Sequence, residues 1–201
     1  MSSKTKPYEY AAALINGRDY KDLSGYPQQW KERARDALFL EVLESFNEMP
    51  IRVFQVGAIE SLQNSFRIGS GWSELFWGAY INKHGGEMTV VDINLDHIAH
   101  STFLSNYFKY KVNLFLEDAI NVIDEGYDIY YLDGADIDHV ADAHEQTLNM
   151  FKKIEHTNSV VLVDDVPTKA EDLIKYLNEK NIKFTEFKTP GSHVMNIDLR
   201  K

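Results

Sequence analysis

Cysteine is absent from the 201-residue sequence, and its absence excludes several kinds of chemistry. Disulfide bonds, zinc–thiolate centres, iron–sulfur clusters and cysteine nucleophiles all require a thiol. Proline is also scarce, with 5 residues in the chain, and no Pro/Gly-rich linker or internal repeat divides it. We therefore expect one domain of ordinary size, long enough to bury a substantial hydrophobic core.

Long apolar runs and clusters of basic residues are missing as well. No run approaches the roughly 20 apolar residues that span a bilayer, and the beginning of the chain, MSSKTKPYEY, lacks the apolar core of a signal peptide. Lys and Arg total 21 against 31 Asp and Glu, which gives a net charge of −10. Since coating a nucleic acid requires a basic surface, this composition disfavours bulk nucleic-acid binding. We expect a cytoplasmic protein without membrane association.

The pattern of apolar residues changes at residue 51. Before it, residues 28–49 carry apolar side chains at the three- and four-residue spacing of a helix. After it, short β-branched runs, predicted as strands, alternate with segments long enough for helices. The predicted strands are 51–58, 87–94, 111–119, 127–135 and 158–166, and the predicted helices are 73–85, 95–108, 139–154 and 169–181. This alternation predicts a doubly wound α/β fold with a parallel sheet.

The chain ends differently. Residues 181–189 and 193–201 are two further strand-like runs, separated only by Pro190-Gly191-Ser192. A connection this short joins antiparallel strands, because parallel strands need a long crossover. The sequence therefore predicts a mostly parallel, seven-stranded sheet that ends in an antiparallel hairpin.

Glycine and acidic residues follow the predicted strands. In open α/β sheets, ligands bind outside the carboxyl ends of the strands, so these positions are the candidate site. Any one of them is often only a turn residue or a helix cap, and together they predict an acidic rim. The residues are Gly57 after the first strand, Asp92 after the second, Asp118 after the third, Asp133 after the fourth, and Asp164 and Asp165 after the fifth.

In this order, the motifs VFQVGAIE, TVVDIN and FLEDA resemble class I S-adenosylmethionine-dependent methyltransferases. The resemblance covers residues 51–201 and implies a Rossmann-like methyltransferase domain, preceded by a helical cap segment over residues 1–50. It implies that Asp92 binds the ribose hydroxyls of S-adenosyl-L-methionine and that Asp118 binds the adenine amino group. The implied cofactor-binding residues are Gly57, Ala58, Glu60, Gly69, Ser70, Gly71, Trp72, Asp92, Ile93, Asp118, Ala119 and Asp133.

The glycine loop departs from the family pattern. The ribose acid usually follows the glycine turn by about 20 residues, yet Gly57 precedes Asp92 by 35 residues. We interpret ESLQNSFRI as an insertion that separates Gly57 from a second piece, Gly69 to Trp72, with Ser73 capping the helix that follows. Which piece contacts the methionine moiety stays open. Gln55 also stands where many relatives carry an acid.

A second group of residues, in YYLDGAD and LVDDV, resembles the metal site of metal-dependent O-methyltransferases. The resemblance implies that Asp133, Asp164 and Asp165 bind Mg²⁺ or another divalent cation, and a hard cation prefers such oxygen ligands. Such a metal binds a substrate hydroxylate and lowers its pKa, which favours an oxygen acceptor. In the alternative interpretation, Asp133 lies beside the methionine end of the cofactor, and the Asp164–Asp165 pair only caps the next loop.

Two histidine positions are candidates for proton transfer. His139 follows Asp133 closely enough to act as a general base with it, since a neutral imidazole suits deprotonation near pH 7. The alternative is that His139 and the nearby His144 are solvent-exposed helix residues. His193, at the start of the last strand, is a weaker candidate for the substrate cleft.

The favoured hypothesis is an S-adenosylmethionine-dependent methyltransferase that acts on a small-molecule acceptor. Two alternatives stay open: a binding module that keeps the cofactor without transfer activity, and a nicotinamide-dependent oxidoreductase. The first 30 residues are rich in aromatic side chains. These either cover the active site, pack on the sheet or form a homodimer contact. They are Tyr8, Tyr10, Tyr20, Tyr26 and Trp30.

Overall fold

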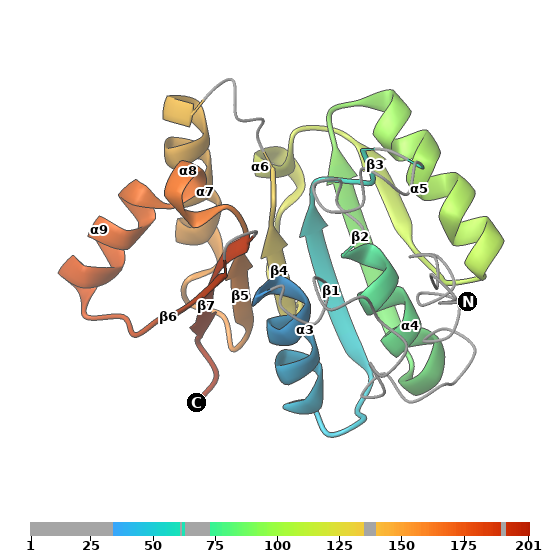
Figure 1. Cartoon of the computed structure of the whole chain (residues 1–201), viewed down its shortest axis with the longest axis horizontal. Helices are drawn as coiled ribbons and strands as arrows, with labels where there is room; N and C mark the ends of the chain where they lie inside the picture. Colours follow the sequence, from blue (N-terminus) through green and yellow to red (C-terminus); the bar gives the residue numbers. More distant parts are fainter. Residues whose placement is uncertain (1–33, 61, 63–72, 135–139, 190–191) are drawn as a thin grey trace, which may run out of the picture.

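A seven-stranded sheet forms the centre of the computed structural model, which describes residues 34–60, 62, 73–134, 140–189 and 192–201 (Figure 1). None of the helices in these ranges is long and apolar enough to cross a membrane. The strands are β1 (Ile51–Val56), β2 (Gly86–Asp92), β3 (Asn113–Leu116), β4 (Ile129–Leu132), β5 (Val160–Val163), β6 (Thr185–Thr189) and β7 (Ser192–Asp198). The helices are α3 (Ala34–Glu44), α4 (Glu74–His84), α5 (Leu95–Phe108), α6 (Ala119–Val122), α7 (Val140–Ile154), α8 (Val166–Lys169) and α9 (Glu171–Lys180).

The strand order is β3-β2-β1-β4-β5-β7-β6. The first five strands pair in parallel, whereas β7 runs antiparallel to both of its neighbours, β5 and β6. The predicted fold class and the terminal hairpin are therefore confirmed. The order differs from the 3-2-1-4-5-6 arrangement of dinucleotide-binding Rossmann folds, because β7 is inserted between β5 and β6.

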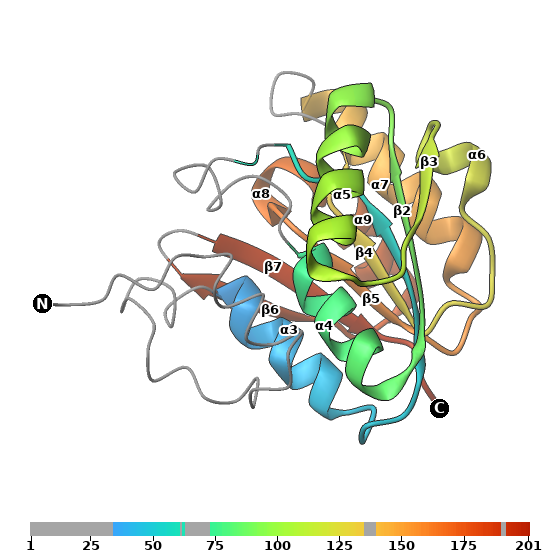
Figure 2. The same cartoon turned by 90° about the vertical axis from the view of Figure 1, so that its right-hand side faces the viewer.

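Helices cover both faces of the sheet (Figure 2). Helices α3, α4 and α5 enclose one hydrophobic core, and α6 to α9 enclose the other. Successive side chains of a strand point to opposite faces, so Ile129 and Tyr131 enter the first core while Tyr130 and Leu132 enter the second. Strands β4 and β5 are buried along their whole length, which explains their continuous apolar runs.

The described part of the N-terminal segment belongs to the same core. Helix α3 contributes Leu38, Phe39, Val42 and Leu43, and the helix packs against β6 and β7. Phe39 contacts the rings of Trp77 on α4 and Tyr131 on β4, at centroid distances of 4.5 and 5.2 Å. This part of the predicted cap segment is therefore an integral layer of the fold.

Candidate functional site at the carboxyl edge of the sheet

The carboxyl ends of five neighbouring strands, β3, β2, β1, β4 and β5, are joined by backbone hydrogen bonds. The residue directly after β1, β3, β4 or β5 donates its N–H to a carbonyl at the end of a neighbouring strand, which brings the predicted acidic rim to one edge, at the top of Figure 1. The bonds run from Gly57 N to Val91 O (2.9 Å), from Asp133 N to Val56 O (3.2 Å), from Asp164 N to Leu132 O (3.2 Å) and from Glu117 N to Asp92 O (3.1 Å).

The ends of β1 and β4 approach each other too closely for side chains at two positions. Gly57 has a φ of +89°, and a Cβ added there would lie 2.6 Å from the carbonyl oxygen of Asp133. A Cβ on Gly134 would lie 2.5 Å from Val56 Cγ1. Both glycines are therefore required by the close packing of these two strand ends.

The buried amide of Gln55 joins the end of β1 to helix α4. Its Nε2 donates to Gly57 O (2.7 Å), and its Oε1 accepts from Ser73 Oγ (3.1 Å) and Trp77 Nε1 (3.0 Å). The predicted N-cap position of Ser73 is therefore confirmed, but its side chain makes no capping hydrogen bond. Ser73 lies at the N-cap position of α4 in helical conformation, and its hydroxyl donates to Gln55 instead of accepting from the helix.

Asp92 lies at the end of β2, against the turn that contains Gly57. Its Oδ1 accepts from Asn94 N (2.7 Å), and its Oδ2 accepts from Ala58 N (2.8 Å). His97 Nδ1 lies 3.1 Å from the same Oδ2, and since a carboxylate only accepts, the ring proton is on Nδ1. Three of the roughly four acceptor sites of the carboxylate are thus in use. Asp92 thus binds the backbone N–H directly after Gly57.

Exposed apolar side chains lie beside Asp92. Ile93 is 78% exposed, and Leu116, the register partner of Asp92 on β3, is 51% exposed. Asp118 is exposed as well, and its Oδ1 accepts from Ile120 N (3.1 Å), so it caps the short helix α6. This edge thus combines a carboxylate with apolar surface, and Asp118 has the capping role that was the alternative to ligand binding.

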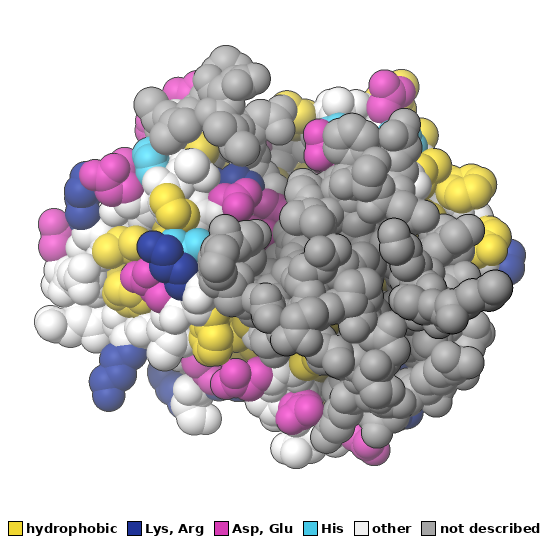
Figure 3. All heavy atoms as spheres, viewed as in Figure 1, with side chains coloured by type: hydrophobic (Ala, Val, Ile, Leu, Met, Phe, Trp, Pro, Cys, Tyr) yellow, Lys and Arg dark blue, Asp and Glu magenta, His cyan; other side chains and the backbone are white. Residues whose placement is uncertain are grey.

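The three aspartates after β4 and β5 surround a buried lysine. Lys169 is 5% exposed, and its Nζ lies 2.6 Å from Asp133 Oδ1 and 3.3 Å from Asp165 Oδ2. The hydroxyl of Tyr131 lies 2.6 Å from Asp164 Oδ2 and 3.1 Å from Asp133 Oδ2. Burial alone would lower the pKa of Lys169, but Asp133, Asp165 and Asp164 together raise it above its ordinary value. On the face drawn in Figure 3, acidic side chains gather near the middle with a basic side chain beside them.

This arrangement does not fit a divalent cation. The ammonium of Lys169 already binds Asp133 and Asp165, two of the three predicted ligands. Among the described residues, no group of three or more His, Cys, Asp or Glu side chains is placed to hold a metal ion. The metal site predicted at Asp133, Asp164 and Asp165 is therefore not supported, because an internal cation neutralises these acids. The sequence analysis missed both Lys169 and Tyr131.

The predicted histidines have structural partners where the structure describes them. His144 Nδ1 accepts from the backbone N–H of Glu171 (3.1 Å), at the start of α9. His193 Nε2 lies 2.7 Å from Glu186 Oε2 on the neighbouring strand β6. The predicted base His139 lies outside the described residues, and its role stays a prediction.

The remaining predicted cofactor residues lie in the two pieces of the glycine loop, apart from Ala119, which lies at the start of α6. Ala58 is buried and donates its N–H to Asp92, whereas Glu60 is exposed. Ala119 is buried at the start of α6. The second piece, Gly69, Ser70, Gly71 and Trp72, lies outside the described residues. Only the first piece is therefore placed beside the acidic rim.

A buried carboxyl group lies behind the glycine turn, and the sequence analysis did not identify it. Glu74, in the first turn of α4, accepts hydrogen bonds from Tyr110 OH (2.6 Å) and Ser101 Oγ (2.8 Å). Burial raises the pKa of Glu74 to about 7, although both hydrogen bonds act to lower it. Ser101 Oγ also accepts from Ile59 N (3.2 Å), so this group is linked to the loop after Gly57.

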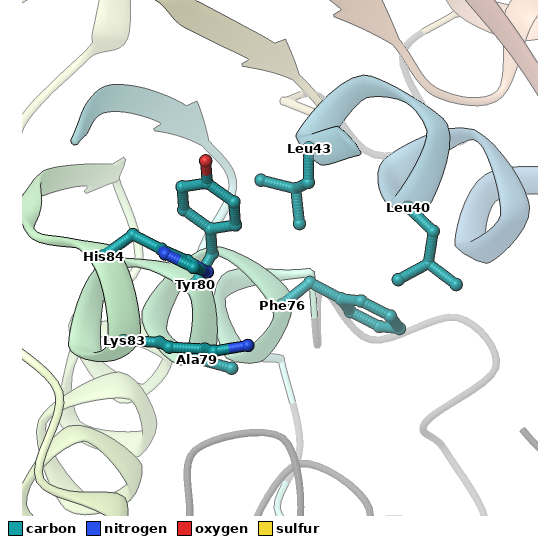
Figure 4. A pocket seen from close by; sticks show the side chains of 7 residues that line it. All are labelled: Leu40, Leu43, Phe76, Ala79, Tyr80, Lys83 and His84. Atoms are coloured by element: carbon teal, nitrogen blue, oxygen red, sulfur yellow. The ribbon is translucent and has the colours of Figure 1, made fainter. Parts of the chain in front are cut away.

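An apolar hollow lies elsewhere, between helices α3 and α4 (Figure 4). Its lining contains none of the predicted site residues. It is lined by Leu40, Leu43, Phe76, Ala79, Tyr80, Lys83 and His84.

No protein-family profile and no curated protein matches the sequence. Solved structures match in fold. The SAH-bound methyltransferase PaMTH1 from Podospora anserina is 13% identical with a TM-score of 0.58, over 98% of this chain and 90% of that chain. The magnesium protoporphyrin IX methyltransferase ChlM from Synechocystis PCC 6803, with bound SAM, is 11% identical with a TM-score of 0.58, over 98% and 93%.

A nucleic-acid-modifying enzyme shares the fold too. The 16S rRNA N2 G1207 methyltransferase RsmC of T. Thermophilus, solved with AdoMet and guanosine, is 17% identical with a TM-score of 0.56 over 82% of this chain. This chain spans only 42% of that protein and 45% of another matched structure. At such identities the likeness shows a Rossmann-like methyltransferase fold, in agreement with the strand order.

Proposed function

We propose that the protein binds S-adenosyl-L-methionine and catalyses methyl transfer to a small-molecule acceptor. The observation that carries the proposal is the position of Asp92, held at the end of β2 against the Gly57–Ala58 turn, in a chain whose fold matches those of solved methyltransferases. The inserted strand β7 also argues against a nicotinamide-dependent oxidoreductase, because dinucleotide-binding folds lack it.

The residues at this edge fit the chemistry of the cofactor. The Asp92 carboxylate is an acceptor suited to ribose hydroxyls, and the exposed Ile93 and Leu116 offer apolar surface to an adenine ring. The absence of a side chain at Gly57 allows the backbone to approach a ligand at the β1 end. S-adenosylmethionine supplies an activated methyl group for direct displacement, so the protein's main task is to position the acceptor.

The acceptor is assigned only by class. A net charge of −10 makes a small molecule a better candidate than a nucleic acid. The preference for an oxygen acceptor was based on a metal-bound hydroxylate, and the position of Lys169 removes that argument. The backbone of Asp133 lies against the Gly57 turn, and we assign its carboxylate to the methionine end of the cofactor or to the acceptor.

Calorimetric titration with S-adenosylmethionine and S-adenosylhomocysteine tests the cofactor assignment. We expect micromolar binding, with a loss of at least about tenfold in Asp92→Ala, because the variant removes the acceptor for the ribose hydroxyls. Asp124→Ala is the matched control, since Asp124 is exposed and precedes β4, at the opposite edge of the sheet. Binding of NAD(P)H in place of the sulfur ligands would contradict the proposal.

Turnover separates the enzyme from a module that only binds the cofactor. Incubation with methyl-labelled cofactor and a panel of small alcohols, phenols, acids and amines should yield a labelled product and S-adenosylhomocysteine. Tight cofactor binding with no transfer to any member of such a panel would favour the binding module. The two experiments therefore test cofactor recognition and catalysis separately.

A further inference from the structure

The buried Lys169 is unusual because its ammonium lies among three carboxylates at the rim of the candidate site. Removing an ammonium from water is costly unless ionised partners compensate for the lost hydration. Asp133 Oδ1 lies 2.6 Å and Asp165 Oδ2 lies 3.3 Å from the Nζ of Lys169, and Asp164 is the third neighbouring charge. The lysine is therefore paired on more than one side.

The backbone after β5 aims the lysine at this position. Asp165 adopts a left-handed conformation (φ +49°) at the N-cap position of α8, two residues after the end of β5. The carbonyl of Asp165 then accepts from Thr168 N (2.8 Å) and Lys169 N (3.1 Å), which closes the single turn of α8. This turn places Lys169 four residues after Asp165, and the side chain of Lys169 reaches Asp133, the residue directly after β4.

A divalent cation and this ammonium would compete for the same oxygen atoms. A metal ion would need to lie about 2 Å from Asp133 Oδ1, the atom that Lys169 Nζ contacts at 2.6 Å. Two cations bound to one carboxylate oxygen at such distances repel each other strongly. The negative charge of these aspartates is therefore balanced by the ammonium of Lys169, without a metal ion.

We infer that Lys169 is the permanent counter-ion of the three aspartates Asp133, Asp164 and Asp165, and that its ammonium takes the place of a divalent cation among them. Lys169 is a positioning residue: it holds Asp133 in a fixed orientation beside the Gly57 turn, and Tyr131 holds the second oxygen of the same carboxylate. The rim then does not recruit Mg²⁺ or Mn²⁺ in the wild-type protein.

Mn²⁺ binding tests this inference without cofactor or acceptor, so its outcome does not depend on the proposed methyl transfer. Electron paramagnetic resonance of free Mn²⁺, together with thermal unfolding, should show no saturable Mn²⁺ binding to the wild-type rim. In Lys169→Ala the midpoint of unfolding should fall, and added Mn²⁺ or ethylammonium should raise it again. Mn²⁺ should then bind at least about tenfold more tightly than in the wild type.

Two further variants act as controls. Lys175→Ala removes an exposed ammonium that pairs with Glu171 and Asp172 on α9, and it should not create a response to Mn²⁺. Lys169→Arg keeps a cation, so it should restore the stability without binding Mn²⁺ even if Lys169→Ala does not fold.

Two results would overturn the inference. The first is saturable Mn²⁺ binding to the wild-type protein that is lost in Asp133→Asn, because the aspartates would then bind a metal with Lys169 in place. The second is a folded Lys169→Ala protein that responds to neither Mn²⁺ nor ethylammonium, because the lysine would then occupy no cation position.

Discussion

Replacement of the buried Glu74 by glutamine is expected to remove a pH-dependent loss of stability. In the folded protein, burial raises the pKa of this carboxyl group from 4.5 to about 7. Below about pH 4.5 the group is protonated in both the folded and the unfolded state, and it does not affect the difference between them. As the pH rises towards 7, only the unfolded state releases the proton readily, so the free energy of unfolding decreases.

The magnitude follows from the difference between the two pKa values. A change from 4.5 to about 7 corresponds to about 3 kcal/mol of unfolding free energy, lost between about pH 5 and pH 8. Glutamine does not titrate, and its amide can still accept from Tyr110 and contact Ser101. The stability of Glu74→Gln relative to the wild type should therefore increase by about 3 kcal/mol over this pH range.

Urea unfolding at a series of pH values measures this difference. Other ionisable groups also contribute to the pH dependence of stability, so only the difference between variant and wild type isolates Glu74. Glu179→Gln is the matched control, because it makes the same replacement of a carboxyl group by an amide at an exposed position on α9. A difference between Glu74→Gln and the wild type that stays constant from about pH 5 to pH 8 would refute the reasoning.

Two further predictions concern Gly57 and the contact of Asp92 with His97. Gly57→Ala should reduce the unfolding free energy by about 3 kcal/mol in urea titrations, because the new Cβ would lie 2.6 Å from Asp133 O at a φ of +89°. Gly85→Ala, at a φ of +90° but with its nearest contact at 3.6 Å, should cost less, because it adds backbone strain without a clash, and equal costs would show that no clash occurs at Gly57. His97→Ala should tighten S-adenosylmethionine binding several-fold in calorimetry, because it frees an acceptor site on Asp92 for a ribose hydroxyl. Weaker binding in this variant would show that His97 orients Asp92 for the ligand.

Much of the fold could be predicted from the sequence, because the apolar periodicity is strong. Helix α5 has the predicted bounds, 95–108, and β1 begins at the predicted residue, Ile51. The single turns α6 and α8 were not predicted, since four residues carry no periodic signal. The position of β7 inside the sheet was also not predicted, because a hairpin pattern does not say which of its strands pairs with β5.

The sequence predicted the residues of the candidate site that lie at strand ends. It did not predict the side chains that bind them. Asp92 and Gly57 follow from the rule that strand ends carry ligand-binding residues. Lys169 was missed because its contact with Asp133 spans 36 residues and depends on the left-handed conformation of Asp165, which the sequence does not reveal. Gln55 was identified from the sequence only as a departure from the family pattern. Its buried contacts with Ser73 and Trp77 could be seen only in the folded structure.

The hydrogen bonds that Asp92 and Asp133 already accept from the protein affect how a ligand can bind there. Each acid near the β1 turn already has donors from the protein: Asp92 has Ala58, Asn94 and His97, and Asp133 has Lys169 and Tyr131. A ligand must therefore exchange hydrogen bonds at these carboxylates and adds few new ones. An exchanged hydrogen bond contributes little net free energy, and its geometry selects for the correct ligand. Apolar contact with exposed side chains such as Ile93 would then supply most of the affinity, while the carboxylates supply the selectivity.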